Sequence, residues 1–311
     1  IMIIGQNDQL FRAGGADRFA VSEGRRADGT PYVRVDGVKD FLIWQTFDCG
    51  QCFRFAPTGD GGWFGAAGGH AAGLRFEGES LVLEGATAAE FEGFWRDYLD
   101  LDRDYAAVRA AFARDPRLAP CVAFAPGIRV LRQPAFEALI AFIVSQNNNV
   151  PRIKGILARL CALFGEPLPG GARAFPTPDR LAACSEAELA PLRSGWRGGY
   201  ILDAARQVAA GTVALQAVAV MPLADARREL TRIRGVGPKV AECVLLYGMG
   251  RLECFPMDVW MKRAMARLFP EETGKMPESA PAIFGPHAGI AQQYIFHYCR
   301  CHPEEIREKT A

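Results

Sequence analysis

The sequence predicts an α+β fold, with an N-terminal antiparallel β-sheet subdomain over residues 1–86 and a mainly α-helical core over residues 87–311. A chain of 311 residues, half of them apolar, can bury a substantial core and divide into two or three subdomains. Short β-prone runs separated by glycine and aspartate turns occupy residues 32–83, and apolar positions at helical spacing follow. Residues 1–30 show little periodicity, so the sequence does not predict where the first strand of the sheet begins.

The strands of the predicted sheet are short runs rich in Val, Leu, Phe, Tyr and Trp. Between two of them lies the segment 48–54, Asp-Cys-Gly-Gln-Cys-Phe-Arg, where Gly50 by itself is typical of an ordinary turn. The runs that we predict as strands are 32–35, 41–44, 62–65, 74–76 and 81–83.

The helical part begins at a capping box formed by Thr87 and Glu90. Further helices are predicted over 104–112, after Pro134, after Thr177, at a second capping box that starts at Ser185, and after Pro222. The helix after Pro134 runs into three asparagines at 147–149, which are poor helix formers. They indicate either a solvated helix terminus or amides that contact base edges.

Charge and cysteine usage exclude several classes of protein. The net charge of +1 does not by itself indicate a nucleic-acid partner. A local basic face is still compatible with it, because the charge averaged over the chain hides patches. The nine cysteines are scattered as reduced thiols, and no second pair at ligand spacing completes a zinc or iron–sulfur site, so we expect no metal. With no apolar run of 18 residues and no signal-like start, we expect a cytoplasmic protein without a membrane partner.

The clearest functional pattern is a helix-hairpin-helix over about residues 223–248. Gly235 and Gly237 make a tight turn, and Pro238 stands where a second helix begins. Glycines there let backbone N–H groups approach a phosphate at the positive end of that helix. We therefore predict that this hairpin holds a nucleic-acid backbone without reading its sequence.

The second hairpin helix is predicted from Pro238 to Tyr247, with Gly248 as its C-cap. Lys239, Cys243 and Tyr247 then share one stripe and can line a pocket. The helix dipole and partial burial both favour a neutral Lys239 amine, which is a nucleophile. The alternative is a lysine that only contacts phosphate.

Asp258 follows an extended segment and precedes a predicted helix, which makes it an N-cap candidate. Helix N–H groups would keep its carboxylate ionised, and an ionised carboxylate next to a sugar stabilises an oxocarbenium-like centre. A plain N-cap is the alternative hypothesis. At the predicted turn 195–199, Trp196 could wedge between bases and Arg197 could contact DNA, or Trp196 could simply pack on the core.

Four segments in matching order, across roughly residues 35–300, resemble a family of DNA repair enzymes, the 8-oxoguanine DNA glycosylases of eukaryotes and some bacteria. The hairpin with Asp258 resembles base-excision glycosylases in general, and a lysine at position 239 resembles the bifunctional branch that also cleaves the strand. The segments are 49–54, 131–149, 235–258 and 285–296.

The resemblance implies roles for single residues in flipping and reading a base. The Gly50 carbonyl would accept the N7–H of 8-oxoguanine, Cys243 and Phe296 would enclose the base, and Gln292 would bond its Watson–Crick edge. The residues that would fill the vacated space and contact the opposite cytosine are Asn147, Arg152 and Arg197, with Trp196 as the aromatic wedge.

The resemblance also implies the chemistry. Lys239 would attack C1′ and form a Schiff base, and β-elimination at the resulting abasic (AP) site would follow, without any metal or organic cofactor. A monovalent cation could bind the hairpin carbonyls, and the partner would be double-stranded DNA with oxidised guanine opposite cytosine, bound by a monomer.

Two departures from the family pattern concern the DNA contacts. Trp260 stands where eukaryotic members have a histidine, and Trp196 replaces a tyrosine. The alternatives are a hairpin glycosylase for another damaged purine, or a non-catalytic DNA-binding module.

Overall fold

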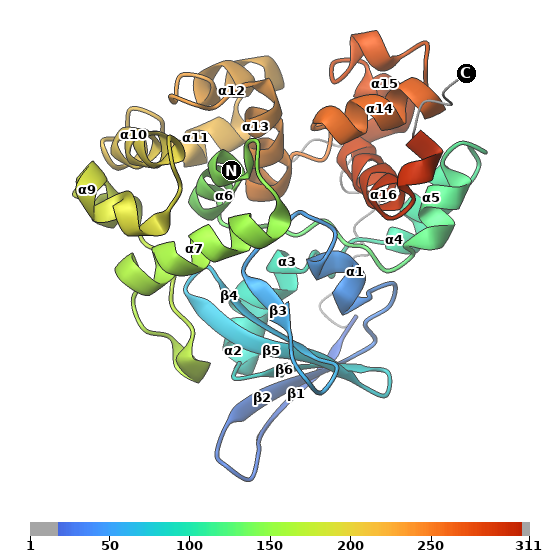
Figure 1. The fold of residues 1–311 in the computed structure, drawn as a ribbon. Coiled ribbons are helices and arrows are strands. Elements are labelled where there is room, and N and C mark those ends of the chain that lie inside the picture. Colours follow the sequence, from blue (N-terminus) through green and yellow to red (C-terminus); the bar gives the residue numbers. More distant parts are fainter. Residues whose placement is uncertain (1–17, 307–311) are drawn as a thin grey trace.

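The computed structural model describes residues 18–306, and Figure 1 shows one β-sheet below two groups of helices. The sheet has six strands, each antiparallel to its neighbours, in the order β1-β2-β6-β5-β4-β3. The predicted fold class, an antiparallel sheet followed by a helical core, is confirmed. The strands are β1 (Ala20–Arg25), β2 (Pro31–Asp36), β3 (Phe55–Pro57), β4 (Trp63–Ala67), β5 (His70–Glu77) and β6 (Ser80–Glu84).

Four of the five predicted runs lie in β2, β4, β5 and β6. Two strands were not expected from the sequence. β1 falls within the stretch that shows no periodicity, and β3 is an edge strand of three residues ending in Pro57, a residue that disfavours strand assignment. Residues 1–17, at the start of the predicted sheet subdomain, lie outside the described residues.

The strand predicted over 41–44 is wrong, because helix α1 (Ile43–Phe47) begins there. The Gln45 side chain accepts the Gly127 N–H at 2.7 Å, and the Thr46 hydroxyl donates to the Gly127 carbonyl at 3.1 Å. Consecutive side chains of a strand point to opposite faces, so a strand could not direct both to one segment. Contacts with a distant loop therefore decide the local structure just before the Gly50 turn.

A nearly continuous helix from Ala88 to Tyr98 packs on the sheet, and Phe91 and Trp95 are fully buried in the cluster of apolar side chains between them. The Thr87 capping box that begins it is confirmed, as is the one at Ser185. The helices are α2 (Ala88–Glu90), α3 (Arg96–Tyr98), α4 (Tyr105–Phe112), α5 (Ala119–Phe124), α6 (Ala135–Ser145), α7 (Val150–Phe164), α8 (Pro178–Ala182), α9 (Glu186–Leu189), α10 (Arg197–Ala209), α11 (Leu215–Val220), α12 (Leu223–Leu230), α13 (Pro238–Cys243), α14 (Val259–Leu268), α15 (Ala280–Phe284) and α16 (Ala288–Cys301).

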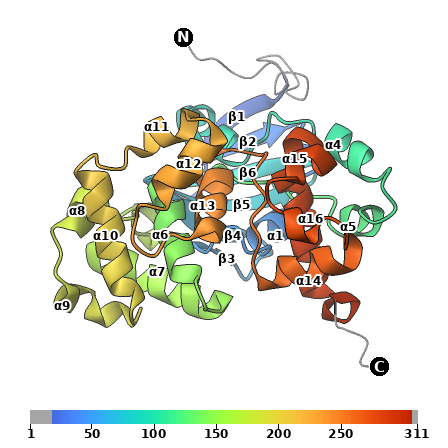
Figure 2. The same cartoon turned by 90° about the horizontal axis from the view of Figure 1, so that it is seen from above.

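The helices form two groups above the sheet, α6–α13 on one side and α4, α5 and α14–α16 on the other, as both views show (Figures 1 and 2). α13 packs against α6 and α12, and α16 packs against α14 and α5. A second, larger cluster of buried apolar side chains runs through both groups. Between residues 18 and 306, the chain contains no helix that is long and apolar enough to cross a lipid bilayer.

The hairpin helix differs from the prediction at its end. α13 stops at Cys243 and continues as one π-helical turn, Val244–Gly248, so Gly248 is not the C-cap. A Cβ atom at Gly248 would lie 2.9 Å from the Ala138 side chain of α6. The glycine at this position therefore permits close packing of the two helices, instead of ending one of them.

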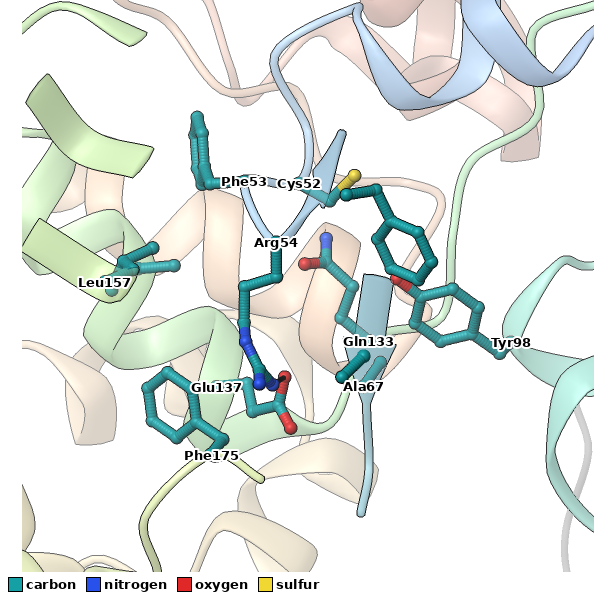
Figure 3. Close-up of a pocket in the computed structure, with 12 residues that line it drawn as sticks. Cys52, Phe53, Arg54, Ala67, Tyr98, Gln133, Glu137, Leu157 and Phe175 are labelled. Atoms are coloured by element: carbon teal, nitrogen blue, oxygen red, sulfur yellow. Dashed lines mark hydrogen bonds and ion pairs between the residues drawn. The ribbon is translucent and has the colours of Figure 1, made fainter. Parts of the chain in front are cut away.

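The sheet and the helical core are also joined by a partly buried ion pair. Figure 3 shows the Arg54 guanidinium between the Glu137 carboxylate and the Phe175 ring, and Nη1 lies 3.2 Å from Oε2 of Glu137. Glu137 also accepts the Gly68 N–H at 2.9 Å. Burial raises the pKa of Glu137 although Arg54 opposes the shift. This contact attaches the strand that follows the Gly50 turn to α6.

Asp100 is a buried carboxylate, 5% exposed, at the end of α3. One oxygen accepts from Arg103 at 2.7 Å and from the Tyr105 hydroxyl at 3.0 Å, and the other accepts from Arg132 at 3.1 Å. Burial by itself would raise the pKa of Asp100, but Arg103 and Arg132 hold it below its ordinary value. The carboxylate thereby connects the sheet-packing helix, α4 and the segment that enters α6.

We predict that Asp100→Ala lowers the free energy of unfolding by about 3–5 kcal/mol, because it leaves buried cations unpaired. Asp97→Ala is the control, since that exposed carboxylate also pairs with Arg132 and should cost less than about 1 kcal/mol. Urea denaturation of both variants at neutral pH measures the difference; equal losses would contradict the prediction.

The same comparison should depend on pH. Because the folded-state pKa of Asp100 is lowered, its stabilisation is complete above the unfolded pKa near ~3.9 and is lost as the pH falls through the folded value. Wild type and Asp100→Ala should therefore converge in stability in strong acid.

Candidate active site

One pocket, with about 290 Å³ of empty space including its open mouth, gathers side chains from distant parts of the chain. All seven residues assigned to chemistry or base contact from the sequence line it, while Phe142 and Pro256 were not expected there. Phe142 belongs to an apolar helix, where the sequence pattern does not distinguish a pocket residue from a core residue. The lining residues are Gly50, Phe142, Lys239, Cys243, Tyr247, Pro256, Asp258, Gln292 and Phe296.

Lys239 lies at the beginning of α13 and is partly buried. Its Nζ is 3.5 Å from the Ser145 hydroxyl and 5.2 Å from the centre of the Phe142 ring. Ser145 donates its only proton to the Phe142 carbonyl at 2.8 Å, so its lone pairs face the lysine. Within residues 18–306 no carboxylate lies within ion-pair distance of Lys239, Asp258 included. Lys239 and Asp258 therefore line the same pocket without forming an ion pair with each other.

Asp258 is the N-cap of α14, as predicted, and its Oδ1 accepts the Met261 N–H at 2.8 Å. In the described chain its other oxygen accepts no hydrogen bond, and the residue also lines the pocket. The N-cap and the pocket hypotheses are thus compatible in one geometry. Trp260, the departure noted above, is 39% exposed at the beginning of the same helix.

Glu242 fixes the segment that carries Asp258, a contact that the sequence did not reveal. Its carboxylate is 2% exposed, accepts the Phe255 N–H at 2.8 Å and receives Nε of Arg227 at 2.6 Å. Since Glu242 is three residues after Lys239 and Phe255 is three before Asp258, this bond holds the two chemical groups at the same pocket.

Cys243 and Tyr247 form one wall of the pocket, and both stay protonated at neutral pH. Burial raises the pKa of the Cys243 thiol to about 11 although Lys239 opposes the shift, and burial also raises the pKa of Tyr247. The Tyr247 ring stacks on Phe142 with centroids 5.3 Å apart. Its hydroxyl lies 2.7 Å from Oε1 of Gln293 and 3.2 Å from Oε1 of Gln292.

Gly50 and Phe296 lie next to each other in the pocket lining. Gly50 has φ +85°, which an L-residue adopts only with strain, and a Cβ added there would lie 3.2 Å from the Phe296 ring. Gly50 is therefore more than an ordinary turn residue, because both its backbone conformation and the neighbouring ring favour glycine.

The two hairpin glycines occupy their positions for different structural reasons. Gly235 has φ +86°, and a Cβ there would lie 2.1 Å from the Tyr200 ring. Gly237 is the N-cap of α13, with no side-chain cap, and a Cβ there would meet nothing within 4 Å. Gly235 is required by packing, whereas Gly237 leaves the surface in front of the helix open.

The asparagine triplet divides into two kinds of residue. Asn148 bonds the Val144 carbonyl at 3.0 Å, and Asn149 caps α7 by accepting the Arg152 N–H at 3.0 Å. Asn147 is exposed with φ +45°, and Arg152 is exposed on the first turn of α7. The helix-terminus hypothesis therefore accounts for two asparagines and leaves Asn147 free to contact a ligand.

The predicted turn over 195–199 is wrong in part, because α10 already begins at Arg197. Trp196 is 52% exposed and its ring packs against Tyr200. Arg197 is only 3% exposed, and it donates to the carbonyls of Gln146, Asn147 and Ser194. An arginine expected at an exposed tip thus holds the loop that presents Asn147.

Metal-ligating side chains do not cluster within residues 18–306, where no three His, Cys, Asp or Glu come together. The cysteines are free thiols, and all except the exposed Cys301 are buried.

Two family models match this chain. The N-terminal domain of 8-oxoguanine DNA glycosylase matches residues 36–139, and the HhH-GPD superfamily of base excision DNA repair proteins matches residues 140–284. The N-glycosylase/DNA lyase OGG1 of Arabidopsis thaliana is 31% identical over 274 residues, which cover 81% of this chain and 75% of that protein.

Solved structures of 8-oxoguanine glycosylases are also similar to this chain. The 8-oxoguanine glycosylase/lyase of Clostridium acetobutylicum, in complex with double-stranded DNA containing cytosine opposite 8-oxoguanine, has a TM-score of 0.86 and 33% identity. The match covers 92% of this chain and 99% of that one. A 3-methyladenine DNA-glycosylase of Archaeoglobus fulgidus, with a TM-score of 0.70 and 21% identity over 86% of this chain and 98% of that one, shares the fold.

The hairpin geometry makes a prediction about stability. Gly235→Ala should lower the free energy of unfolding by more than about 2 kcal/mol, because it combines positive-φ strain with overlap on Tyr200. Gly237→Ala, two residues away in open space, should cost less than about 1 kcal/mol. Chemical denaturation measures the free energy of unfolding of both variants. A larger decrease for Gly237→Ala than for Gly235→Ala would contradict the conclusion that packing requires glycine at position 235.

Proposed function

Because this chain belongs to the 8-oxoguanine DNA glycosylase/lyase family of the helix-hairpin-helix superfamily, we propose that it excises 8-oxoguanine from duplex DNA and then cleaves the strand. The observation that carries the proposal is that Lys239 and Asp258 line the same pocket as Gly50, Gln292 and Phe296. A non-catalytic DNA-binding module would need the hairpin but not this combination.

The proposed chemistry uses Lys239 as nucleophile. Its neutral Nζ forms a bond to C1′ of the flipped nucleotide as the bond from C1′ to N9 of the base breaks, and the base leaves with the electron pair and takes up a proton. The Asp258 carboxylate stabilises the positive charge that develops on the sugar. The lysine adduct opens to a Schiff base, loss of a C2′ proton expels the 3′ phosphate by β-elimination, and hydrolysis of the imine frees the enzyme.

The proposed recognition separates lesion from normal base by one proton. The Gly50 carbonyl accepts N7–H, which 8-oxoguanine has and guanine lacks, and leaving that carbonyl unpaired costs about 1–3 kcal/mol. The Cys243 thiol and the Phe296 ring enclose the base, and Gln292 bonds its Watson–Crick edge. Protonation of Cys243 supports this arrangement, because a neutral thiol packs against a neutral base without charge.

We further propose that Asn147 enters the vacated space, that Trp196 wedges beside it, and that Arg152 and Arg197 contact the opposite cytosine. Exposure of the first two and of Arg152 supports these contacts. Arg197 would have to exchange its present carbonyl partners for the base. We also propose that the protein acts on DNA as a monomer.

The proposed mechanism requires no metal or organic cofactor. The hairpin carbonyls of Arg234, Gly235 and Val236 accept no hydrogen bond in the described chain, so they are available to a monovalent cation. Such an ion would supply positive charge beside a bound phosphate and would take no part in the reaction at C1′.

Borohydride should trap wild-type protein covalently on duplex DNA with 8-oxoguanine opposite cytosine, and Lys239→Gln should abolish trapping because no imine can form. Lys275→Gln is the control, since Lys275 is exposed and forms an ion pair with Glu272, away from the pocket. Trapping is measured by gel shift. Trapping on another lesion but not on 8-oxoguanine would overturn the substrate assignment, and no trapping or base release on any lesion would favour a binding module.

Gly50→Ala should reduce 8-oxoguanine excision about tenfold or more, because strain and the Phe296 contact move the carbonyl that reads the base. Cleavage of a preformed abasic site, which has no base to read, should be much less affected. Gly29→Ala carries the same kind of strain at φ +86° with nothing within 4 Å, and it should leave both activities unchanged. A uniform loss of both activities in Gly50→Ala would contradict a specific role in reading the lesion.

A further inference from the structure

The backbone turn 48–51 is held by side chains at every carbonyl except one. Arg300 donates to the Asp48 carbonyl, Gln293 donates to the Cys49 carbonyl at 2.9 Å, and Gln133 donates to the Gln51 carbonyl at 2.7 Å. Within the described residues, the Gly50 carbonyl accepts no hydrogen bond. The free acceptor is the one that the proposed function assigns to the lesion.

Glycine does not fix the direction of that carbonyl by itself, because it populates more backbone conformations than any other residue. The peptide plane before it is fixed, however, when the Cys49 carbonyl is held by Gln293. With that plane set and Gly50 at φ +85°, the ψ angle of Gly50 is the remaining freedom, and Gln133 restrains it from the following residue. Figure 3 shows Gln133 beside the segment that follows the turn.

Gln293 is suited to this task by burial and by its second bond. Its side chain is 1% exposed, and while Nε2 donates to the turn, Oε1 accepts the Tyr247 hydroxyl at 2.7 Å. The orientation of the amide is determined, because a backbone carbonyl only accepts and the phenol supplies a proton. Both ends of the Gln293 amide therefore form hydrogen bonds, and a flip of the amide group would break both of them.

The Tyr247 hydroxyl has a single proton and two amide oxygens within reach. Oε1 of Gln293 is the closer at 2.7 Å, against 3.2 Å for Oε1 of Gln292. Gln293 therefore takes the proton, and the amide oxygen of Gln292 keeps capacity for a ligand. Adjacent residues of α16 thus divide two tasks, one supporting the turn and one facing the pocket.

We propose that Gln293 is a positioning residue for lesion discrimination, which aims the Gly50 carbonyl through the Cys49 peptide and couples it, through Tyr247, to Gln292. The proposal rests on the proposed function, since it assumes that the Gly50 carbonyl reads the base. Gln293 does not itself line the pocket, so it acts through the turn and not by contact with DNA.

Gln293→Met tests this role, because methionine keeps the length of the side chain and removes both hydrogen bonds. Single-turnover rates are measured on two duplexes opposite cytosine, one with 8-oxoguanine and one with a preformed abasic site. We expect the ratio of 8-oxoguanine excision to abasic cleavage to fall about tenfold, equivalent to about 1.4 kcal/mol. Tyr294→Phe is the matched control on the same helix, since its buried hydroxyl meets no hydrogen-bond partner at bonding distance among residues 18–306, and the ratio should not change.

The double variant Gln293→Met with Tyr247→Phe separates positioning from simple packing. It removes the phenol, whose remaining acceptor in the single variant is the more distant Oε1 of Gln292 at 3.2 Å, so melting temperature should recover relative to the single variant. If Gln293 positions the turn, the ratio stays low in the double variant, because the Cys49 carbonyl is still unheld. Recovery of the ratio would overturn the proposal, as would an unchanged ratio or an equal loss of both activities in the single variant. Absence of 8-oxoguanine excision by wild type would instead overturn the proposed function.

Discussion

The bond between the Glu242 carboxylate and the Phe255 N–H sets the geometry on which the rest of the site depends. A carboxylate that is 2% exposed is stable only with partners, and Arg227 from the first hairpin helix supplies the countercharge. The hairpin, Lys239 and the segment leading to Asp258 are therefore held by one buried group. Loss of that group would leave Arg227 without its counterion and release the segment, so stability and chemistry are linked at this point.

The π-helical turn after Cys243 supplies a second constraint. A regular helix would let the stripe of Lys239, Cys243 and Tyr247 drift around the axis, but i to i+5 bonding turns less per residue and brings Tyr247 back toward the pocket. The Tyr247 carbonyl lies in the last turn of the helix, where it has no intrahelical partner, and it accepts the Gln133 N–H at 2.7 Å. Since the Gln133 side chain holds the Gln51 carbonyl, the end of the hairpin helix is connected directly to the Gly50 turn.

The features that could be predicted from sequence are those that local chemistry determines. The capping boxes, the Asp258 N-cap and the four strand runs depend on neighbours within a few residues, and the structure contains them. Helical spacing placed Lys239, Cys243 and Tyr247 on one pocket-lining stripe, as observed. Gly50, Gln292 and Phe296 were placed at the base through resemblance, since segments far apart in the chain carry no physical mark of their proximity. Their individual roles stay predictions until the variants above are measured.

Long-range partners explain what the sequence did not reveal. Helix α1 begins within a predicted strand because Gln45 and Thr46 bond Gly127, which lies 82 and 81 residues further along the chain. Arg197 is buried because three distant or adjacent carbonyls surround its guanidinium. Glu242 and Gln293 gave no signal, because a single polar residue in a helical pattern is usually solvated, and only the folded chain supplies the groups that each one holds.

In the proposed mechanism, these supports serve the chemistry and the discrimination of the lesion from different parts of the fold. Glu242 acts from α13 on the segment of Asp258, whereas Gln293 acts from α16 on the turn that leads out of the sheet subdomain. The two systems meet at Tyr247, whose ring belongs to the pocket wall and whose hydroxyl donates to Gln293 while Oε1 of Gln292 lies 3.2 Å away. A base that draws the Gln292 amide away from Tyr247 would remove this competing acceptor and strengthen the bond from Tyr247 to Gln293. Contact with the Watson–Crick edge would then reinforce the N7–H acceptor on the other side of the base, so the two readings of one lesion need not be independent.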